Sequence, residues 1–562
     1  PPGRSNAGRI SIYPGVMGAA PLAEQLREID GPLADMRLGE ALAVVADSDG
    51  DGVNDIAAHA QRDSSEFHHG GRSYLITRGL DEVEEAIDLF TPLEIPRQVA
   101  AGRFGEGVAF VGDLDRDGHS EYVVTASHVT ASAGRSGGAW LFSGDAGRAG
   151  DPGIPLTDFP NHTGYDLLWG ASAAGDFNGD GLPDFALLLR DDERPTDSQL
   201  AQNPWREVVE GACGPRGYNT GGVYVFLGQP DGQFPTRPSL AFWGADAGSS
   251  PESLVGPLDF NGDGYSDLLL GSFRSDPGGR NNAGKSLIIE GRSRLGSGDE
   301  IDVICTPYAA YEGPTNGMEL GRSVTPLGDI NGDGCDDYAV GSRLEDRPSL
   351  NDEGGVRIIY GFGGPGCLSQ PHAHRLASGE RNSQAGWSLA VGDGDGDGRP
   401  ELAIGAWQSR NENVPVGRVW VIPGDALSAL TPRPVSDAET ATPTLLSAWG
   451  ESWTIQGKQR DENFSYRLAF AGGLLAVSAP QAALADQARV GTVSLYRITS
   501  SGISSHPAAL VFGESERPHG RLGFSLAGRE SAIHSQLLIG APWGSGTGLD
   551  NGSVYQLIFA AE

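Results

Sequence analysis

The sequence predicts an all-β fold, namely a single β-propeller built from four-stranded antiparallel blades. Three observations predict it: six acidic loops recur along the chain, each loop lies between two short apolar runs, and 84 Gly and 36 Pro punctuate the 562 residues. Short apolar runs bounded by turn residues are typical of buried strands. The loop starts lie 63 to 83 residues apart, a period that fits a propeller blade with connections of varied length.

Each acidic loop carries a carboxylate or amide oxygen at positions 1, 3, 5 and 9 and a Gly at position 6. Oxygen donors at this density on a tight turn suit Ca²⁺, which takes about six to eight oxygen ligands, and the Gly permits the turn. The carbonyl of residue 7 would complete the set. We therefore predict about six Ca²⁺ ions as cofactors. The expected ligands at positions 1, 3, 5, 7 and 9 are Asp47, Asp49, Asp51, Val53 and Asp55; Asp113, Asp115, Asp117, His119 and Glu121; Asp176, Asn178, Asp180, Leu182 and Asp184; Asp259, Asn261, Asp263, Tyr265 and Asp267; Asp329, Asn331, Asp333, Cys335 and Asp337; and Asp393, Asp395, Asp397, Arg399 and Glu401.

These loops differ from EF-hands at position 12. An EF-hand places a bidentate Glu there and a helix on each side. Position 12 is apolar in all six loops: Ala58, Val124, Leu187, Leu270, Val340 and Ile404. Each loop therefore joins two strands.

The loops belong to a longer repeat. After the second strand comes a variable segment, and then a third strand that opens with Gly, as in 138–142, 222–226, 355–359 and 417–421. Units at 464–496 and 522–555 repeat the strands without the acidic loop. We therefore favour eight blades in residues 37–562, with metal loops in units 1–6 and none in units 7 and 8, and keep seven blades as the alternative.

Residues 1–36 form a partial repeat that is expected to close the ring. The last unit ends at its third strand and leaves an edge unpaired, which is an aggregation hazard. The segment before Leu38 could pair with that edge. Residues 8–13 copy a third strand, and residues 22–32 could supply a fourth. Either the strand at 8–13 packs outside the ring, or it pairs with another molecule and mediates self-association.

The Phe-Gly openings such as Phe104-Gly105, the acidic loops, and the Gly-Ala-Pro ending at 540–542 resemble the FG-GAP repeat of integrin α-subunit propellers. The resemblance implies a closed propeller with calcium loops on one face and ligand contacts on the opposite face. Integrin heads have seven blades, whereas this chain has eight units and a fragment. The sequence contains no integrin leg and no transmembrane helix, so an integrin's own function does not carry over.

Composition and charge exclude some classes of binding partner. The net charge of −34 argues against nucleic acid, and no apolar run approaches the roughly 20 residues that span a membrane. Open calcium loops bind at about 10⁻⁴–10⁻³ M, which is useful outside cells. We therefore expect an extracellular, cell-surface or periplasmic protein. Only Lys285 and Lys458 are lysines among the 40 basic residues, a bias that suggests a bacterial source.

Four cysteines allow three pairings. Cys335 lies in the fifth acidic loop, and Cys367 follows the third strand of the same unit, so both belong to the loop face. Cys213 and Cys305 are expected on the opposite face, with Cys305 at the end of the fourth strand of unit four. We favour the pairs Cys335–Cys367 and Cys213–Cys305, with free buried thiols as the alternative.

No catalytic constellation stands out, and no catalytic residue is assigned. The long connections between second and third strands are where recognition is expected. They carry the candidate ligand-face residues Arg194, Trp205, Arg206, Tyr218, Arg274, Arg280 and Trp407. The predicted function is an extracellular, calcium-stabilised binding or adhesion module that recognises a protein or glycan through the face opposite the loops. The alternatives are a lectin or a carbohydrate-active enzyme such as a polysaccharide lyase.

Overall fold

The computed structural model describes residues 9–15, 27–30, 38–44, 56–60, 72–76, 91–92, 104–131, 134–143, 153–156, 168–190, 206–210, 221–243, 251–293, 300–304, 306–483, 489–512, 521–529, 534–544 and 551–560. The structural statements below concern these residues. For some of these residues, including all those before Gly107, the structure describes the backbone and not the side chain. None of the helices in this part of the chain has the length and apolar character needed to span a membrane.

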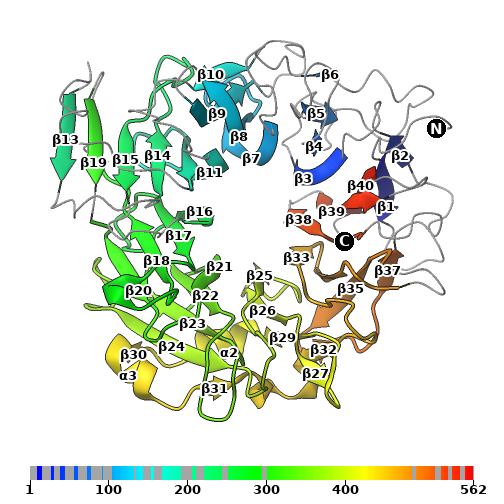
Figure 1. Ribbon diagram of the computed structural model, residues 1–562. Coiled ribbons are helices and arrows are strands. Elements are labelled where there is room, and N and C mark those ends of the chain that lie inside the picture. Colours follow the sequence, from blue (N-terminus) through cyan, green and yellow to red (C-terminus); the bar gives the residue numbers. More distant parts are fainter. Residues whose placement is uncertain are drawn as a thin grey trace.

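Strands that follow one another along the chain form common sheets, which lie around a common centre (Figure 1). The first four sheets are, from their inner strand outwards, β3 (Leu38–Val44), β4 (Ile56–Ala60), β5 (Arg72–Ile76) and β6 (Thr91–Pro92); β7 (Phe104–Gly112), β8 (Glu121–Ala131), β9 (Gly134–Phe142) and β10 (Ile154–Leu156); β11 (Leu168–Gly175), β12 (Asp184–Leu189), β14 (Gly222–Phe226), β15 (Leu240–Trp243), β19 (Glu300–Ile304) and β13 (Arg206–Glu210); and β16 (Ser253–Leu258), β17 (Asp267–Ser272), β18 (Lys285–Ile289) and β20 (Ala309–Glu312).

The remaining sheets continue the same order. They are β21 (Leu320–Gly328), β22 (Asp337–Ser342), β23 (Gly355–Tyr360) and β24 (His372–Ala377), with β30 (Arg433–Pro434) and β31 (Thr444–Leu445) on β24; β25 (Ser388–Gly392), β26 (Glu401–Ala406), β29 (Arg418–Ile422) and β32 (Thr454–Gln456); β33 (Leu468–Ala471), β34 (Leu474–Ala479) and β35 (Thr492–Thr499), with β36 (Gly502–Ile503) and β37 (Ala509–Phe512) on β35; and β38 (Ser525–Arg529), β39 (His534–Gly544), β40 (Asn551–Ala560), β1 (Arg9–Gly15) and β2 (Arg27–Asp30).

Several short helices and strands lie in the connections between the main strands. They are the two-stranded ribbon of β27 (Arg410–Asn411) and β28 (Val414–Pro415), the helices α2 (Gly424–Ser428) and α3 (Val435–Thr440), and the 3₁₀ turns η2 (Pro277–Gly279), η3 (Leu446–Trp449) and η4 (Glu451–Trp453). The third strands predicted at 138–142, 222–226, 355–359 and 417–421 coincide with β9, β14, β23 and β29 to within a few residues.

The first strand of each sheet lies nearest the centre (Figure 1). Along the chain these strands are β3, β7, β11, β16, β21, β25, β33 and β38. Each contacts the first strand of the next sheet, and β38 contacts β3. The described residues therefore form an all-β structure of mainly four-stranded antiparallel sheets, an arrangement consistent with a β-propeller.

The sheets that begin with β11, β16, β21, β25 and β33 bury both of their faces against their neighbours. In β12, Phe185, Leu187 and Leu189 join an apolar cluster with the sheet of β7–β10. The alternate residues Ala186 and Leu188 join a cluster with the sheet of β16–β20. Successive side chains of a strand point to opposite faces, so a strand buried on both faces needs a continuous apolar run. Clusters shared by the later neighbouring sheets follow the same rule.

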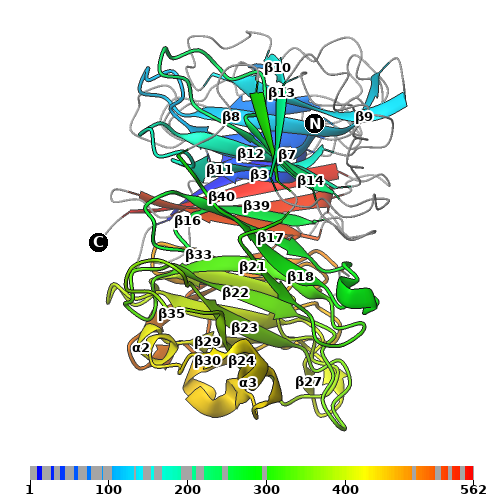
Figure 2. The same cartoon turned by 90° about the vertical axis from the view of Figure 1, so that its left-hand side faces the viewer.

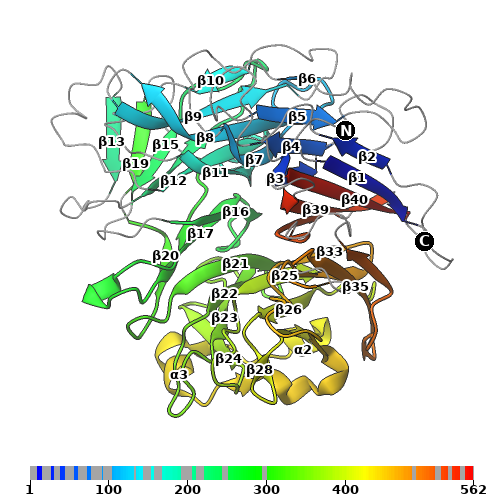
Figure 3. The ribbon, with the colours of Figure 1, turned by 45° about the vertical axis from the view of Figure 1, so that its right-hand side comes forward.

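The two ends of the chain meet in one sheet. Strand β1 pairs in parallel with β40, from Arg9 opposite Ser553 to Gly15 opposite Phe559, and β2 pairs antiparallel with β1 (Figure 3). The N-terminal segment therefore pairs with the last unit, as expected from the sequence. The strand at 8–13, which the sequence analysis left with two possible roles, is itself the pairing strand.

The sheet that starts with β11 departs from the expected four strands. Strand β19 pairs in parallel with β15, and β13 pairs in parallel with β19 at the outer edge. The expectation that Cys305 ends the fourth strand of unit four is therefore wrong, because β20 is the outer strand of that sheet. The physical reason is packing: Val303 of β19 is fully buried in the cluster that contains Trp243.

Helix α3 lies beside β24, at the outer edge of the sheet of β21–β24 (Figure 2), and a buried ion network joins the two. Arg357 on β23 is 1% exposed and donates hydrogen bonds to Glu439 of α3, at 3.0 Å, and to Glu345. Arg375 also donates to Glu345, and Tyr311 donates to Glu439. Burial raises the pKa of both glutamates, but the charge of Arg357 outweighs it and holds each pKa below its usual value.

We predict that Arg357→Met lowers the free energy of unfolding by about 3–5 kcal/mol at neutral pH, because it removes the buried cation that Glu439 pairs with and leaves Glu345 with Arg375 alone. A depressed pKa in the folded state gives stability that is present above the unfolded pKa and is lost as pH falls through the folded pKa. The difference between wild type and variant should therefore shrink below about pH 4. Urea unfolding across pH measures it, and a difference that is small at pH 7 would contradict the prediction.

Candidate functional site

Five of the six acidic loops lie in the described part of the chain. They connect β7 to β8, β11 to β12, β16 to β17, β21 to β22 and β25 to β26, so each joins the inner strand of its sheet to the second strand. All five therefore lie at the same end of the inner strands. The loop at 47–55, with Asp47, Asp49, Asp51, Val53 and Asp55, falls outside the described residues.

The five loops share one hydrogen-bond pattern. The Gly N–H at position 6 donates to the position-1 carboxylate at 2.8–3.0 Å. The N–H of residue 7 donates to the position-5 carboxylate, also at 2.8–3.0 Å. The N–H of residue 5 donates to the oxygen of residue 3 at 2.9–3.2 Å. The position-6 glycines have φ between +81° and +94°, which explains why Gly is required there.

The position-9 carboxylate is the buried anchor of the loop. It is at most 1% exposed in all five loops. In the loop at 259–267, Asp267 accepts the N–H of Phe260 at 2.9 Å and that of Gly291, just beyond the third strand, at 2.7 Å. Asp184, Asp337 and Glu401 accept the same two kinds of amide. This carboxylate therefore ties the loop to the exit of the third strand.

Burial makes the ionised form of these anchors costly. It raises the pKa of Asp184 and of Glu401 to about 7, and the pKa of Asp267 and of Asp337 to about 8, although backbone hydrogen bonds oppose the shift. Nearby loop carboxylates add to the rise. A divalent cation beside such carboxylates would favour their ionised form.

The oxygen atoms fit a hard cation. Carboxylate oxygens of Asp113, Asp115 and Glu121 lie within 4.8 Å of one another, and so do those of Asp393, Asp395 and Glu401. The Oδ1 atoms of Asp113 and Asp176, both at position 1, are shielded from solvent and have no hydrogen-bond partner. Buried oxygens without a donor are unusual in proteins, and an ion is one way to satisfy them. The residues present therefore fit Ca²⁺ bound through oxygen.

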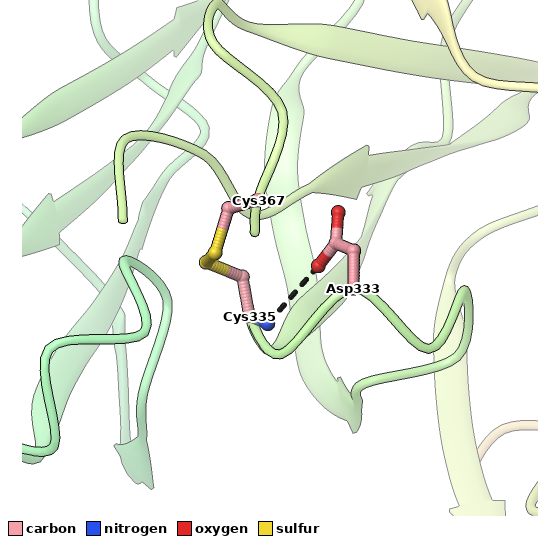
Figure 4. Close-up of side chains that lie close together, drawn as sticks. All are labelled: Asp333, Cys335 and Cys367. Atoms are coloured by element: carbon pink, nitrogen blue, oxygen red, sulfur yellow. Dashed lines mark hydrogen bonds between the residues drawn. A yellow bond between two sulfur atoms is a disulfide. The ribbon is translucent and has the colours of Figure 1, made fainter. Parts of the chain in front are cut away.

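A third cluster, Asp333 with Cys335 and Cys367, has a different nature (Figure 4). The two cysteines form a disulfide with Cα atoms 5.8 Å apart, so they offer no thiolates to a metal. The Cys335–Cys367 pair agrees with the sequence analysis, whereas Cys213 and Cys305 fall outside the described residues. The N–H of Cys335 donates to Asp333 at 3.0 Å, which is the shared loop pattern.

Acidic loops of adjacent sheets are joined by hydrogen bonds. The N–H of Asp259 donates to the Asp336 carboxylate at 2.8 Å, and the N–H of Asp336 donates to the Asp259 carbonyl at 2.8 Å. A Cβ added to Gly262 would lie 2.9 Å from both sulfurs of the disulfide. The loops of adjacent sheets are therefore packed against each other as well as within their own units.

The candidate ligand-face residues are scattered. Arg194, Trp205 and Tyr218 fall outside the described residues, and Arg206 lies on β13, the outermost strand of its sheet, so its expected place among the loops of the opposite face is wrong. Arg280 pairs with Glu312 at 2.7 Å. The Arg274 side chain is 53% exposed beside Glu252, and the Trp407 ring lies 5.1 Å from that of Trp387.

Sequence reasoning missed a cavity at the opposite end of the inner strands. Its volume is about 410 Å³, and it is lined by residues that open β11, β16, β21, β25 and β33 or directly precede them, including Trp169, Glu252, Arg322, Trp387 and Arg467. The sequence signal that could have located this cavity is the residue that directly follows the Gly at the start of each repeat. Arg322 and Trp387 directly follow Gly in the repeat, and Phe524 occupies the same place in the last unit.

We predict that Asp267→Asn destabilises the calcium-free protein by about 1–3 kcal/mol, because an amide has one acceptor oxygen and leaves one of two buried N–H donors unpaired. The matched change Asp263→Asn, at the exposed position 5, keeps an acceptor for Tyr265 and should cost little. Thermal unfolding in a chelator measures both. Equal losses would show that position 9 has no special structural role.

The segments that are similar to known proteins contain these same repeats. The FG-GAP repeat family matches residues 252–289 and 385–422, which contain β16–β18 and β25–β29. The chain is 32% identical over 163 residues to Integrin alpha-PS2 of Drosophila melanogaster, covering 27% of this chain and 11% of that protein. It is 27% identical over 274 residues to Integrin alpha-3 of Cricetulus griseus, covering 46% and 24%.

A second kind of relative is Phosphatidylinositol-glycan-specific phospholipase D of Bos taurus, 30% identical over 148 residues, which are 26% of this chain and 17% of that protein. The chain thus spans less than a quarter of the length of each of these three relatives. All three are animal proteins, and nothing in them supports the bacterial source suggested by the Arg-over-Lys bias. The chain carries FG-GAP repeats and is similar, over part of its length, to integrin α-subunits and to phosphatidylinositol-glycan-specific phospholipase D.

Proposed function

We propose that this chain is an extracellular binding or adhesion module, stabilised by Ca²⁺, that recognises its ligand through the face opposite the acidic loops. The observation that carries the proposal is that the two ends of the inner strands differ. Five described inner strands have an acidic loop at one end, and β11, β16, β21, β25 and β33 line the mouth of a cavity at the other end. Similarity to integrin α-subunits agrees with it. The disulfide supports an oxidising compartment outside the cytosol.

The proposed scaffold is an eight-bladed propeller closed by the N-terminal strand. The succession of inner-strand contacts from β3 to β38 and back to β3 supports it, and so does the pairing of β1 with β40. Removing residues 1–36 would expose the edge of β40, an unpaired strand that invites aggregation. We expect the truncated chain to melt earlier and to self-associate. Gel filtration and thermal unfolding test this, and a monomer with an unchanged melting curve would contradict closure by this strand.

The proposed cofactor is Ca²⁺ in all six loops, the loop at 47–55 included because it repeats the same residue types. The donor set and the partnerless Oδ1 atoms of Asp113 and Asp176 support the proposal. The ions would be structural, since each loop joins two strands of one sheet. At ~1 mM Ca²⁺ and a Kd of ~10⁻⁴ M, one site adds about 1.4 kcal/mol and six independent sites about 8 kcal/mol.

We predict that chelation lowers the melting temperature by many degrees, because that much stabilisation rivals the net stability of a whole domain. Asp180→Ala should reduce the bound Ca²⁺ by one ion per chain and leave the other sites filled. The exposed Asp231, which lies outside the repeat motif, provides the control variant Asp231→Ala. Elemental analysis after dialysis and melting curves with and without chelator measure both effects. An unchanged melting curve in chelator would contradict a structural role for the ions.

The ligand face can be mapped by charge reversal. Arg274, near the mouth, and Arg410, on the exposed ribbon of β27 and β28, both lie in connections between second and third strands. Arg116 is exposed in an acidic loop, at a position without a ligand role. On an array of extracellular proteins and glycans in Ca²⁺, we expect the double variant Arg274→Glu, Arg410→Glu to weaken binding by about tenfold or more.

Arg116→Glu should leave binding on the array unchanged, because it alters only the loop face. The reverse result would assign recognition to the loops and contradict the proposal. Release of new reducing or unsaturated ends from a bound polysaccharide would instead identify an enzyme.

A further inference from the structure

The mouth of the cavity concentrates positive charge in a strongly acidic protein. Arg322 and Arg467 both line it, and the chain as a whole has a net charge of −34. Among the described residues, neither guanidinium forms an ion pair with a carboxylate. Around them, Arg343 pairs with Glu319 at 2.7 Å, and Arg190 pairs with Glu252 at 3.1 Å. The described charges at the mouth therefore leave an excess of guanidinium.

The two arginines line the same cavity. Burial lowers the pKa of Arg322 and the charge of Arg467 lowers it further, while the Glu252 carboxylate opposes the shift. Like charges kept together in a half-buried site repel each other, and an anion placed between them would relieve the repulsion. The aromatic rings beside them hold the guanidinium groups in place: Arg322 lies 4.8 Å from the centre of the Trp387 ring and 5.0 Å from that of Phe273.

A donor without an acceptor lies at the same place. Trp387 lines the cavity, and its Nε1 is shielded from solvent and has no hydrogen-bond partner in the described part of the chain. Buried indole N–H groups usually have one. This N–H is too buried to reach a ligand in the cavity, so the groups that the mouth offers to a carboxylate are the two guanidinium groups without an ion pair among the described residues.

The walls of the cavity mix aliphatic and polar side chains, because Ser253, Ser323 and Ser388 line it beside the aliphatic residues. Leu254, Val324, Leu389 and Leu468 line the cavity, and its volume of about 410 Å³ falls within the range of small-ligand sites. The aromatic rings of the mouth are already engaged. The guanidinium of Arg190 lies 4.5 Å from the centre of the Trp169 ring. The centre of the Trp387 ring lies 5.2 Å from the guanidinium of Arg343 and 5.7 Å from the centre of the Tyr466 ring. The mouth thus offers charge beside aliphatic surface, and few free ring faces on which a sugar could stack.

We propose that this mouth binds the carboxylate of an Asp or Glu side chain in an acidic peptide segment of a protein ligand, with a neighbouring aliphatic side chain against the leucines of the wall. The proposal rests on the proposed function and deepens it, because it names the ligand chemistry of the same face. Arg322 and Arg467 are the anion-binding residues, and the Trp387 ring positions Arg322.

The test uses the full chain in Ca²⁺ and three probes at millimolar concentration: a blocked Leu-Glu-Leu peptide, its Leu-Gln-Leu counterpart and a short oligogalacturonate. Saturation-transfer NMR reports binding. We expect the Glu peptide to bind, the Gln peptide to bind at least about tenfold more weakly, and added salt to weaken the Glu peptide. Arg467→Gln should cost about tenfold or more and still fold, because Arg467 is exposed.

Arg322→Gln should cost about as much, Arg322→Lys should restore part of the binding, and Arg460→Gln, at a remote exposed arginine, should change nothing. Absence of binding by the Glu peptide, equal binding of the Gln peptide, or indifference to Arg467→Gln would overturn the proposal. Binding of the oligogalacturonate alone would overturn the peptide assignment. If an array ligand depends on Arg274 and Arg410 but not on Arg322 and Arg467, the proposed function stands and this inference fails.

Discussion

The structure depends on one buried carboxylate in each described acidic loop. At position 9 of each described loop, an acidic side chain with almost no solvent exposure ties the loop to its own sheet, and in four of the loops it also accepts an amide from just beyond the third strand. Removing such a group leaves buried donors unpaired, which costs more than the net value of an ordinary hydrogen bond. The same residue is too buried to ionise easily by itself, which explains why a cation beside it would matter.

The second constraint is that the sheets beginning with β11, β16, β21, β25 and β33 are buried on both faces. None of these five sheets can bury its own apolar surface alone, because the residues of a strand such as β12 divide between two neighbouring clusters. Stability in such a repeat is a sum over neighbours, so the first and last units are weak points unless they meet. The pairing of β1 with β40 joins them, and the contact of β38 with β3 continues the succession of inner strands.

Much of this followed from local sequence. Short continuous apolar runs, loop oxygens at fixed spacing and a Gly in each loop located the strands and turns, and the topology of one unit was enough to pair Cys335 with Cys367. The predictions that failed concern contacts between residues far apart in the sequence. The sheet edge that β19 joins depends on the space beside Trp243, and no pattern within residues 300–304 reveals it. Arg322 and Trp387 were missed because one residue in each repeat carries little signal until the ring brings the repeats together.

The account rests on the acidic loops being ion sites whose geometry sets the turn of each unit. Crystals grown in Ca²⁺ and measured at a wavelength where calcium scatters anomalously test this most directly. The account predicts an anomalous peak in each loop, with oxygens of positions 1, 3 and 5 and the carbonyl of residue 7 at about 2.3–2.6 Å. Loops that keep the hydrogen-bond pattern seen here, with no anomalous density at saturating Ca²⁺, would contradict it and leave the buried position-9 carboxylate as the sole organiser of the turn.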